Sequence, residues 1–231
     1  MDSVTLPRVS AVILAGGKSQ RMGRNKAFIE FGGKPLIARV VERVRDLGTE
    51  VIIVANAVDA YVQFGTRVVS DVYPGKGSLG GIYSGLVAAR EEYVLAVACD
   101  MPFLNAAVLR YLISLAPPFD VVIPRAPISH LANRAMSQRS SRRPWRSDKP
   151  IAKGRNLHPF HAVYSKRCLE PMRARLLAND LRAISFLDTV RVRVVEQDET
   201  AHLDPKHLSF FNANMLEDLQ IASQLGNQTT S

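Results

Sequence analysis

The feature that most constrains the chain is a largely apolar run, Val9–Leu14, which leads almost directly into a pair of glycines, Gly16 and Gly17. A short run of this kind, bounded by a turn signal, is typical of a buried strand. Glycine lets a backbone approach a ligand closely because no Cβ atom stands in the way. The beginning of the chain therefore predicts a buried strand whose end is open to a bound molecule.

Basic residues follow this glycine pair at once. Lys18, Arg21 and Lys26 lie within nine positions of one another, and Gly23 provides a further turn between them. Such a cluster of positive charge suits an anionic ligand. Together with the glycines, it favours a nucleoside triphosphate held at the carboxyl edge of a sheet.

Two better-known phosphate-binding patterns fit the chain less well. Residues Gly17–Ser19 resemble the end of a Walker A loop, but Val12 stands where that loop needs its first glycine. Residues Gly75–Gly80 fit the pattern G-x-G-x-x-G, and Asp100 follows 20 positions later, as in a dinucleotide-binding fingerprint. In that fingerprint, however, the strand runs straight into the turn, whereas here Asp71–Pro74 intervenes. A dinucleotide site is therefore not favoured.

The composition is that of one α/β domain, with 231 residues of which 47% are hydrophobic. The two cysteines, Cys99 and Cys168, favour free thiols in a reducing cytoplasm over a disulfide. The apolar run near the N-terminus is too short for a signal peptide or a membrane span. We therefore expect a cytoplasmic protein without a membrane partner.

The net charge of +9 is concentrated in one segment. Residues 125–155 contain nine Lys or Arg residues and a single acid, Asp148, while the rest of the chain has 21 bases and 20 acids. The segment has no apolar periodicity, and such a composition cannot bury enough surface to offset its ordering entropy. We predict a single domain, 1–231, that carries a basic and mostly mobile insertion at about 125–156.

This basic segment leaves one alternative class of function open. Trp145 lies among its arginines, and single-stranded nucleic acid is bound by stacking combined with positive charge. One aromatic side chain makes a poor stacking platform, so a solvated loop is favoured over a nucleic-acid site.

Strand and helix signals alternate over most of the chain, which predicts a doubly wound, mostly parallel α/β sheet with ligands at the carboxyl ends of its strands. After the basic segment, an ordered stretch is expected to resume at 159–164. A helix that ends near 177 follows it, and residues 180–187 come after that helix. The expected strands are 9–14, 50–55, 67–69, 93–99, 120–123 and 190–195, and the expected helices are 36–47, 59–64, 81–92, 105–116, one that ends near 177, and 215–226.

Asp100 is the strongest metal-ligand candidate, because an apolar strand that ends in an acid at a sheet edge is a favoured ligand position. Mg²⁺ typically takes one or two carboxylates together with phosphates, so a lone Asp100 would suffice. The alternatives are that Asp100 caps the turn before Pro102 and that Asp71 is an ordinary turn residue. His158 and His161 form H-x-x-H but lack a third ligand at suitable spacing for zinc, and His161 is instead predicted to face an acceptor cleft.

Five blocks of sequence, in this order, resemble the motifs of the MobA-type molybdenum cofactor guanylyltransferases. One such block would be weak, since related nucleotidyltransferases share the first, but five in order are specific. The blocks are Leu14–Lys26, Asp71–Ile82, Cys99–Leu104, His161–Tyr164 and Phe211–Leu219.

The resemblance implies a Rossmann-like, GT-A-like nucleotidyltransferase fold and a defined reaction. In that reaction the terminal phosphate of molybdopterin attacks the α-phosphorus of GTP, which gives molybdopterin guanine dinucleotide and pyrophosphate, with Mg²⁺ required. The implied partners are GTP, molybdopterin (as Mo-molybdopterin), and proteins that deliver the cofactor and mature molybdoenzymes.

The resemblance also assigns roles to individual positions. Asp100 would bind both the nucleotide and the metal, and Asp100, Lys26 and Arg21 would be the catalytic groups. The acceptor side would involve His161, Asn212 and Asn214. The nucleotide-binding positions would be Leu14, Ala15, Gly16, Gly17, Lys26, Asp71, Gly80 and Asp100.

The chain departs from the family pattern at two places. Asn25 stands where the family usually has Asp, and Met215–Leu216 replaces the usual Thr-Pro. The L-A-G-G form at Leu14–Gly17 resembles guanylyl transferases, whereas cytidylyl relatives more often show L-A-A-G. GTP is therefore preferred, with a cytidylyltransferase or a sugar-phosphate nucleotidyltransferase on the same fold as the alternative.

Overall fold

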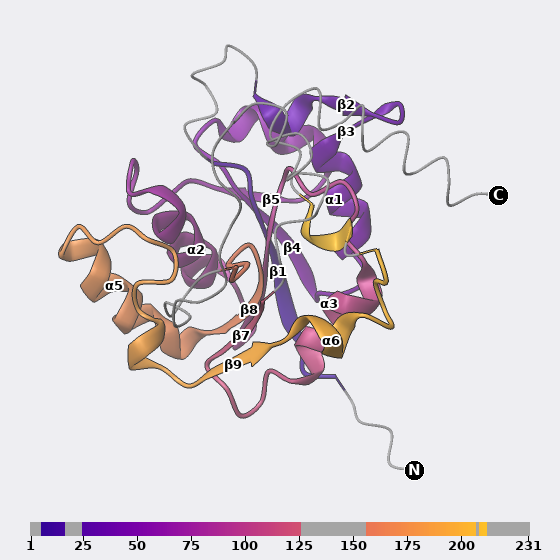
Figure 1. Ribbon diagram of the computed structural model, residues 1–231. Helices are drawn as coiled ribbons and strands as arrows, with labels where there is room; N and C mark the ends of the chain where they lie inside the picture. Colours follow the sequence, from indigo (N-terminus) through magenta and orange to yellow (C-terminus); the bar gives the residue numbers. More distant parts are fainter. Residues whose placement is uncertain (1–5, 17–24, 126–155, 207, 212–231) are drawn as a thin grey trace, which may run out of the picture.

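The computed structural model of the chain describes residues 6–16, 25–125, 156–206 and 208–211 (Figure 1). Within these residues, seven strands form one sheet. Every neighbouring pair is parallel except the two pairs that involve β8, which is antiparallel to both β6 and β7. The predicted doubly wound, mostly parallel sheet is thus confirmed. The spatial order is β5 (Arg67–Val69), β4 (Glu50–Val54), β1 (Val9–Leu14), β6 (Tyr93–Ala98), β8 (His161–Ser165), β7 (Val121–Pro124) and β9 (Val192–Val195).

The first strand, β1, is completely buried at the centre of the sheet. Its side chains alternate between the two faces, so Ala11 and Ile13 join one hydrophobic core while Val12 and Leu14 join the other. The strand order also reverses at β1, since β4 and β5 lie on one side of it and β6 on the other. Ligands of open α/β sheets bind at such a switch point, outside the carboxyl ends of the strands.

Helices cover both faces of the sheet (Figure 1). One face is packed by α1 (Leu36–Val44) and α3 (Ala106–Ser114), whose apolar side chains share a core cluster with β1. The other face is packed by α2 (Gly77–Ala88) and α5 (Leu169–Leu177). The short α6 (Gln197–Thr200) follows β9.

Two predicted helices have different ends in the structure. The helix expected over 36–47 stops at Val44, and Gly48 then passes so close to β1 that a Cβ atom there would lie 2.8 Å from the backbone nitrogen of Ala11. The helix expected over 81–92 is α2, which begins at Gly77. Glycine is required at position 85 of this helix because a Cβ atom there would lie 2.5 Å from Val12 Cγ1.

Several small elements were not expected from the sequence. Gly32 and Gly33, both with positive φ, turn the chain between β2 (Glu30–Phe31) and β3 (Lys34–Pro35), which pair in antiparallel fashion. The helix expected over 59–64 is a 3-10 helix. The 3-10 helices are η2 (Lys26–Phe28), η3 (Val58–Phe64), η4 (Lys166–Cys168), η5 (Leu187–Thr189) and η6 (Leu208–Phe210).

The basic segment enters at the connection between β7 and β8. Its flanking residues Arg125 and Leu157 form an antiparallel bridge, so the segment begins and ends at the carboxyl edge of the parallel strands. Residues 126–155 and the helix expected at 215–226 lie outside the described residues, so the mobility of the one and the existence of the other stay predictions, as does the single domain over 1–231. The described strands on both sides of the segment nevertheless share one sheet.

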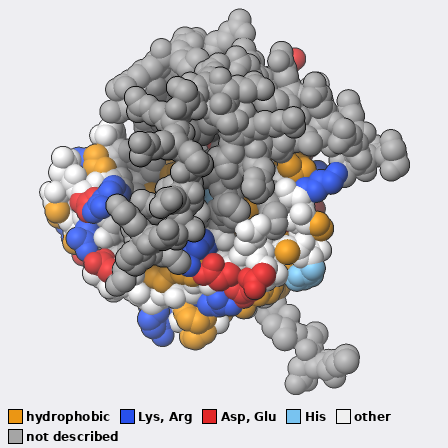
Figure 2. Space-filling model, in the orientation of Figure 1, with side chains coloured by type: hydrophobic (Ala, Val, Ile, Leu, Met, Phe, Trp, Pro, Cys, Tyr) orange, Lys and Arg blue, Asp and Glu red, His pale blue; other side chains and the backbone are white. Residues whose placement is uncertain are grey.

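Basic and acidic side chains lie side by side over the coloured part of the surface in Figure 2, in line with the near balance of charge outside the basic segment. Arg125, at the start of the basic segment, is also paired, because its guanidinium lies 2.7 Å from the Glu196 carboxylate. Among the described residues, no helix has the length and apolar character needed to cross a bilayer.

Candidate active site

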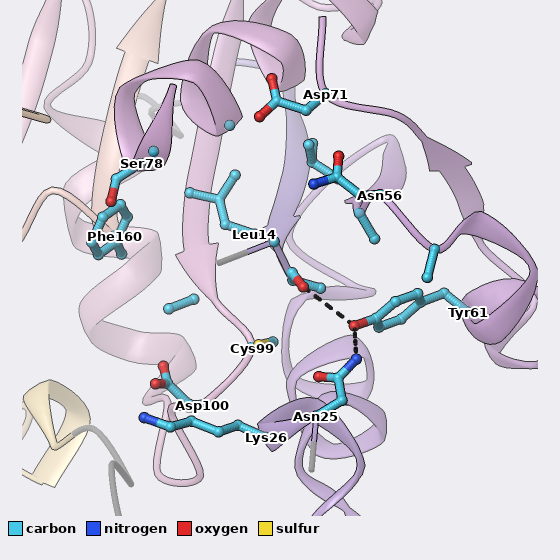
Figure 3. Close-up of a pocket in the computed structure, with 18 of the residues that line it drawn as sticks. Leu14, Asn25, Lys26, Asn56, Tyr61, Asp71, Ser78, Cys99, Asp100 and Phe160 are labelled. Carbon is cyan, nitrogen blue, oxygen red and sulfur yellow. Dashed lines mark hydrogen bonds between the residues drawn. The ribbon is translucent and has the colours of Figure 1, made fainter. Parts of the chain in front are cut away.

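A pocket of about 670 Å³ lies at the carboxyl edge of the sheet (Figure 3). Its floor and walls come from the ends of β1, β4 and β6 and from the beginning of α2, which is the switch point identified above. This volume is typical of sites for small organic ligands and cofactors. The fold therefore places a cavity where the topology predicts a ligand.

The end of β1 forms the centre of this pocket. Leu14, Ala15 and Gly16 line it together. The backbone here is fixed by its neighbours, since the Ala15 N–H donates to the Val54 carbonyl at 3.0 Å and the Cys99 N–H donates to the Leu14 carbonyl at 3.2 Å. A Cβ atom on Gly16 would meet nothing closer than 4.0 Å, so this glycine leaves open space at the pocket floor. Gly17 and Arg21 lie outside the described residues.

Lys26 and Asp100 face one another in the pocket (Figure 3). Lys26 belongs to η2, and Asp100 follows directly after β6 and Cys99. Burial raises the pKa of Asp100, and the charge of Lys26 opposes this effect without cancelling it. Asp100 is thus a carboxylate that the protein solvates poorly, and a further cation beside it would be favourable.

Asp71 lies on the opposite side of the pocket, near Asn56 (Figure 3). Its Oδ1 accepts hydrogen bonds from the Ser84 hydroxyl at 2.7 Å and from the Tyr73 N–H at 3.0 Å. Asp71 therefore does form a turn, as the alternative interpretation held, but its carboxylate also faces the cavity. The two interpretations of this residue are compatible.

The beginning of α2 supplies another favourable environment for negative charge. Gly77, Ser78 and Gly81 line the pocket, and the first turn of a helix presents unpaired N–H groups and a partial positive charge. Gly80 does not line the pocket. A Cβ atom there would lie 3.2 Å from the Tyr73 carbonyl and 3.4 Å from Asp71 Oδ1, so Gly80 permits close packing behind the wall. Its direct contact with a nucleotide stays a prediction.

Sequence reasoning missed several residues that line the pocket. Tyr61 accepts a hydrogen bond from Asn25 Nδ2 at 2.7 Å and donates one to the Ala15 carbonyl at 3.2 Å. Asn56 and Phe160 also line the cavity. Asn56 was detectable, because it follows the strand at 50–55 in the same way that Asp100 follows the strand at 93–99.

His161 is completely buried at the beginning of β8. Its ring packs against Phe210 with a centroid distance of 4.8 Å, and neither ring nitrogen has a hydrogen-bond partner among the described residues. Burial, reinforced by the charge of His158, lowers the pKa of His161 to about 3, so the ring is neutral at physiological pH. Its contact with an acceptor stays a prediction, and Asn212 and Asn214 lie outside the described residues.

The donor set of the pocket suits a cation that brings other ligands with it. Within the described ranges, no group of three or more His, Cys, Asp or Glu side chains is placed to hold a metal ion. Zinc usually needs such a set, whereas Mg²⁺ is commonly held by one or two carboxylates plus substrate phosphates. Asp100 alone therefore fits a magnesium ion that arrives with a nucleotide. Cys99 and Cys168 are free thiols.

These features define a class of protein: an α/β protein that presents a glycine-floored, lysine- and carboxylate-bearing pocket at the switch point of its sheet. Residues 11–195 match the family model of the MobA-like NTP transferase domain. The match covers most of the chain, and the chain belongs to this family.

Similar proteins agree with this membership. A probable molybdenum cofactor guanylyltransferase from Pelotomaculum thermopropionicum is 34% identical over 92% of this chain and 90% of its own length. A molybdenum cofactor guanylyltransferase from Desulfosudis oleivorans is 33% identical over 96% and 95%. Among solved structures, molybdopterin-guanine dinucleotide biosynthesis protein A from Archaeoglobus fulgidus shares the fold, with a TM-score of 0.73 at 21% identity over 95% of this chain and 100% of that one.

Proposed function

We propose that this protein transfers GMP from GTP to the terminal phosphate of molybdopterin. The observation that carries the proposal is the convergence of Gly16, Lys26 and Asp100 on one pocket, in a chain whose curated relatives are named molybdenum cofactor guanylyltransferases. The products would be molybdopterin guanine dinucleotide and pyrophosphate. An oxygen of the pterin phosphate forms a bond to the α-phosphorus of GTP, and the bond from that phosphorus to the bridging oxygen of the β-phosphate breaks.

Such a transfer needs no nucleophile from the protein, because the acceptor phosphate is one already. The protein has to align two anions that repel each other and to offset the charge of the leaving pyrophosphate. Lys26 and the N-terminus of α2 would hold the phosphates, with Arg21 as a further cation. The backbone at Leu14–Gly17 would support the nucleotide, and Asp71 would face its nucleoside side.

Asp100 would hold a Mg²⁺ ion. Its carboxylate faces the pocket, and burial leaves it poorly solvated, so binding a cation relieves an existing cost. When bound, Mg²⁺ would supply positive charge that offsets the negative charge of the phosphates. Lys26, which faces Asp100 in the same pocket, would add its own positive charge toward these phosphates.

His161 would serve the acceptor side, with Asn212 and Asn214. A neutral imidazole whose ring nitrogens have no hydrogen-bond partner among the described residues can donate and accept hydrogen bonds to a polar heterocycle. This role requires Phe210 or His161 to shift, because the ring is covered. His161→Phe should therefore weaken the use of the pterin acceptor and leave GTP binding unchanged.

GTP is preferred over CTP because of the L-A-G-G sequence at the end of β1 and because of the names of the relatives. The test is competition calorimetry with Mg²⁺ and each nucleoside triphosphate, followed by pyrophosphate release with molybdopterin. The proposal predicts that GTP binds most tightly and supports turnover. Tighter binding of CTP, or turnover with a sugar phosphate in place of molybdopterin, would assign the chain to another transferase of the same fold.

The remaining partners follow from the substrates. Proteins that deliver molybdopterin and mature molybdoenzymes would meet this edge of the sheet. The free thiols of the protein would suit the cytoplasm.

The segment 125–155 would not be needed for GTP, so its deletion should leave GTP affinity unchanged. If the segment instead makes this a nucleic-acid-binding protein, the chain will bind RNA or DNA with an affinity that falls steeply with salt.

A further inference from the structure

One phenol oxygen connects two separate parts of the pocket. Tyr61 Oη accepts from Asn25 Nδ2 at 2.7 Å and donates to the Ala15 carbonyl at 3.2 Å (Figure 3). Ala15 lies at the end of β1, and Asn25 immediately precedes η2, which begins at Lys26. Tyr61 belongs to a third segment, η3, and is only 1% exposed.

The direction of each bond in this bridge is fixed by its chemistry. Asn25 Oδ1 accepts from the Ala27 N–H at 3.1 Å, which caps η2, so the amide nitrogen of Asn25 must face Tyr61. The phenol has one proton. Because the Asn25 amide is a donor, that proton is committed to the Ala15 carbonyl. Burial raises the pKa of Tyr61, so the proton is retained at neutral pH.

The bridge holds two stretches of chain that line the pocket. In a trans peptide the carbonyl and the following N–H point in opposite directions, so holding the Ala15 carbonyl toward Tyr61 turns the Gly16 N–H away from it. Holding Asn25 fixes the residue next to Lys26, whose side chain faces Asp100. Tyr61 thereby links the β1 backbone to the turn that carries Lys26.

The aromatic ring of Tyr61 is anchored independently of its hydroxyl group. It packs against Phe28 and Phe64, with centroid distances of 5.1 and 6.4 Å. A phenylalanine at position 61 would keep these contacts and lose the bridge alone. The single substitution Tyr61→Phe therefore removes the hydrogen-bonded bridge and keeps the packing of the ring.

We propose that Tyr61 is a positioning residue for the triphosphate, whose hydroxyl group holds the Ala15–Gly16 peptide and the Asn25–Lys26 turn in one fixed geometry. The inference rests on the proposed function for the identity of the ligand. It assigns to Tyr61 and Asn25 a role that concerns the phosphates of the nucleotide and not its base.

The test compares Tyr61→Phe with the wild-type protein in calorimetric titrations of GTP and of GMP, each with Mg²⁺. A hydrogen bond contributes about 0.5–1.5 kcal/mol net, so GTP affinity should fall about 3- to 10-fold. The affinity for GMP should change much less, because GMP lacks the β- and γ-phosphates. Tyr111→Phe is the matched control. It removes a tyrosine hydroxyl that donates to Glu199 at 3.1 Å, away from the pocket, and should leave both affinities unchanged.

A double-mutant cycle with Asn25→Ser tests the bridge itself. Serine is a good N-cap and can still accept from the Ala27 N–H, but it is too short to replace the amide that reaches Tyr61. Asn25→Ser should weaken GTP binding in the wild-type background and have a smaller effect in the Tyr61→Phe background. Additive effects of the two changes would contradict a shared bridge.

A ligand-free readout separates this inference from the proposed function. In ¹³C NMR of the protein without nucleotide, Tyr61→Phe should move the Ala15 carbonyl resonance upfield, and an unmoved resonance would overturn the bridge. Equal losses of GTP and GMP affinity would overturn the positioning role, since a general structural defect would explain them. If the wild-type protein prefers CTP, the same comparison is made with CTP and CMP. A wild-type protein that binds neither GTP nor CTP would overturn the proposed function, while the carbonyl resonance would still report the bridge.

Discussion

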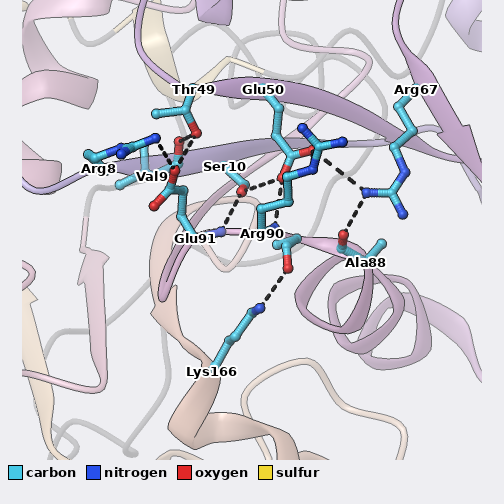
Figure 4. A network of polar contacts seen from close by, with 11 residues as sticks. Arg8, Val9, Ser10, Thr49, Glu50, Arg67, Ala88, Arg90, Glu91 and Lys166 are labelled. Atoms are coloured by element: carbon cyan, nitrogen blue, oxygen red, sulfur yellow. Dashed lines mark hydrogen bonds and ion pairs between the residues drawn. The ribbon is translucent and has the colours of Figure 1, made fainter.

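The carboxylates at the two ends of the central sheet lie in opposite electrostatic environments. At the amino end, Glu50 accepts hydrogen bonds from the Ser10 hydroxyl at 2.8 Å and the Arg90 N–H at 2.7 Å, with the charges of Arg67 and Arg90 at 3.6 and 3.8 Å (Figure 4). Burial alone would raise the pKa of Glu50, but these contacts bring it below its usual range. At the carboxyl end, burial raises the pKa of Asp100 despite Lys26.

This difference separates stability from function within one sheet. Glu50 is ionised at little cost because its charge is already compensated, so its contacts stabilise the fold. Asp100 is ionised at a cost that folding alone does not recover, and a ligand cation would recover it. Proteins commonly retain such locally unfavourable groups where they bind or react.

The comparison is tested most strongly by neutralising each carboxylate without changing its size. Asp100→Asn should lower turnover by several orders of magnitude, because it removes the carboxylate proposed to hold Mg²⁺ and with it the charge that would offset the reacting phosphates. The ligand-free variant should unfold at a temperature no lower than the wild type. Pyrophosphate release and thermal denaturation measure the two effects. Near-normal turnover would place the metal elsewhere.

Lys26→Ala removes the cation that faces Asp100. Hydrogen bonds to charged groups contribute about 1.5–3 kcal/mol, so GTP affinity should fall about 10- to 100-fold. Calorimetry measures this loss, and Lys34→Ala is a suitable control because that lysine pairs with Glu42 on the exposed surface. Unchanged affinity for GTP would make Lys26 an ordinary surface lysine.

Glu50→Gln is the matched change at the amino end. It removes the charge that Arg67 and Arg90 compensate, and we expect the free energy of unfolding to fall by about 1 kcal/mol. The midpoint of urea denaturation measures this loss. The affinity for GTP should not change, and a substantial loss of affinity would mean that the two ends of the sheet are coupled.

The smallest expected effect is on the pH dependence of unfolding, where the sign of the change should differ between the two carboxylates. The folded pKa of Glu50 lies below its ordinary value of 4.5, so the stability that separates the wild type from Glu50→Gln should persist at neutral pH and vanish only below about 4.5. The folded pKa of Asp100 lies above its ordinary value of 3.8, so the advantage of Asp100→Asn should disappear as the pH falls through that raised pKa. Thermal denaturation from pH 7 to 3 measures both differences, and identical profiles for the two variants would contradict the contrast.

The core of the site was predictable because parallel strands bring their carboxyl ends to one edge. The strand at Val9–Leu14 and the strand that precedes Asp100 are both largely apolar runs, which suits neighbouring buried strands, and they pair in parallel in the structure. Lys26 is close in sequence to the first of these strands. Local signals together with the family resemblance therefore predicted that Gly16, Lys26 and Asp100 would converge.

Other features depend on contacts that no local pattern specifies. The antiparallel direction of β8 depends on how the chain returns after the basic segment, and the short apolar run at His161–Ser165 does not indicate direction. The helix that begins at Gly77 is rich in glycine and so contradicts intrinsic propensity, and at Gly85 close packing against Val12 requires the glycine. The bridge from Tyr61 to Asn25 joins residues 36 positions apart, and only the folded structure brings them together.

The most direct test is a crystal structure of the protein with GTP and Mg²⁺ bound. The account predicts that the triphosphate lies between Lys26 and the first turn of α2, that the backbone at Gly16 contacts it, and that the metal ion is bound by Asp100. A nucleotide bound at any other place, or a metal ion out of reach of Asp100, would contradict it.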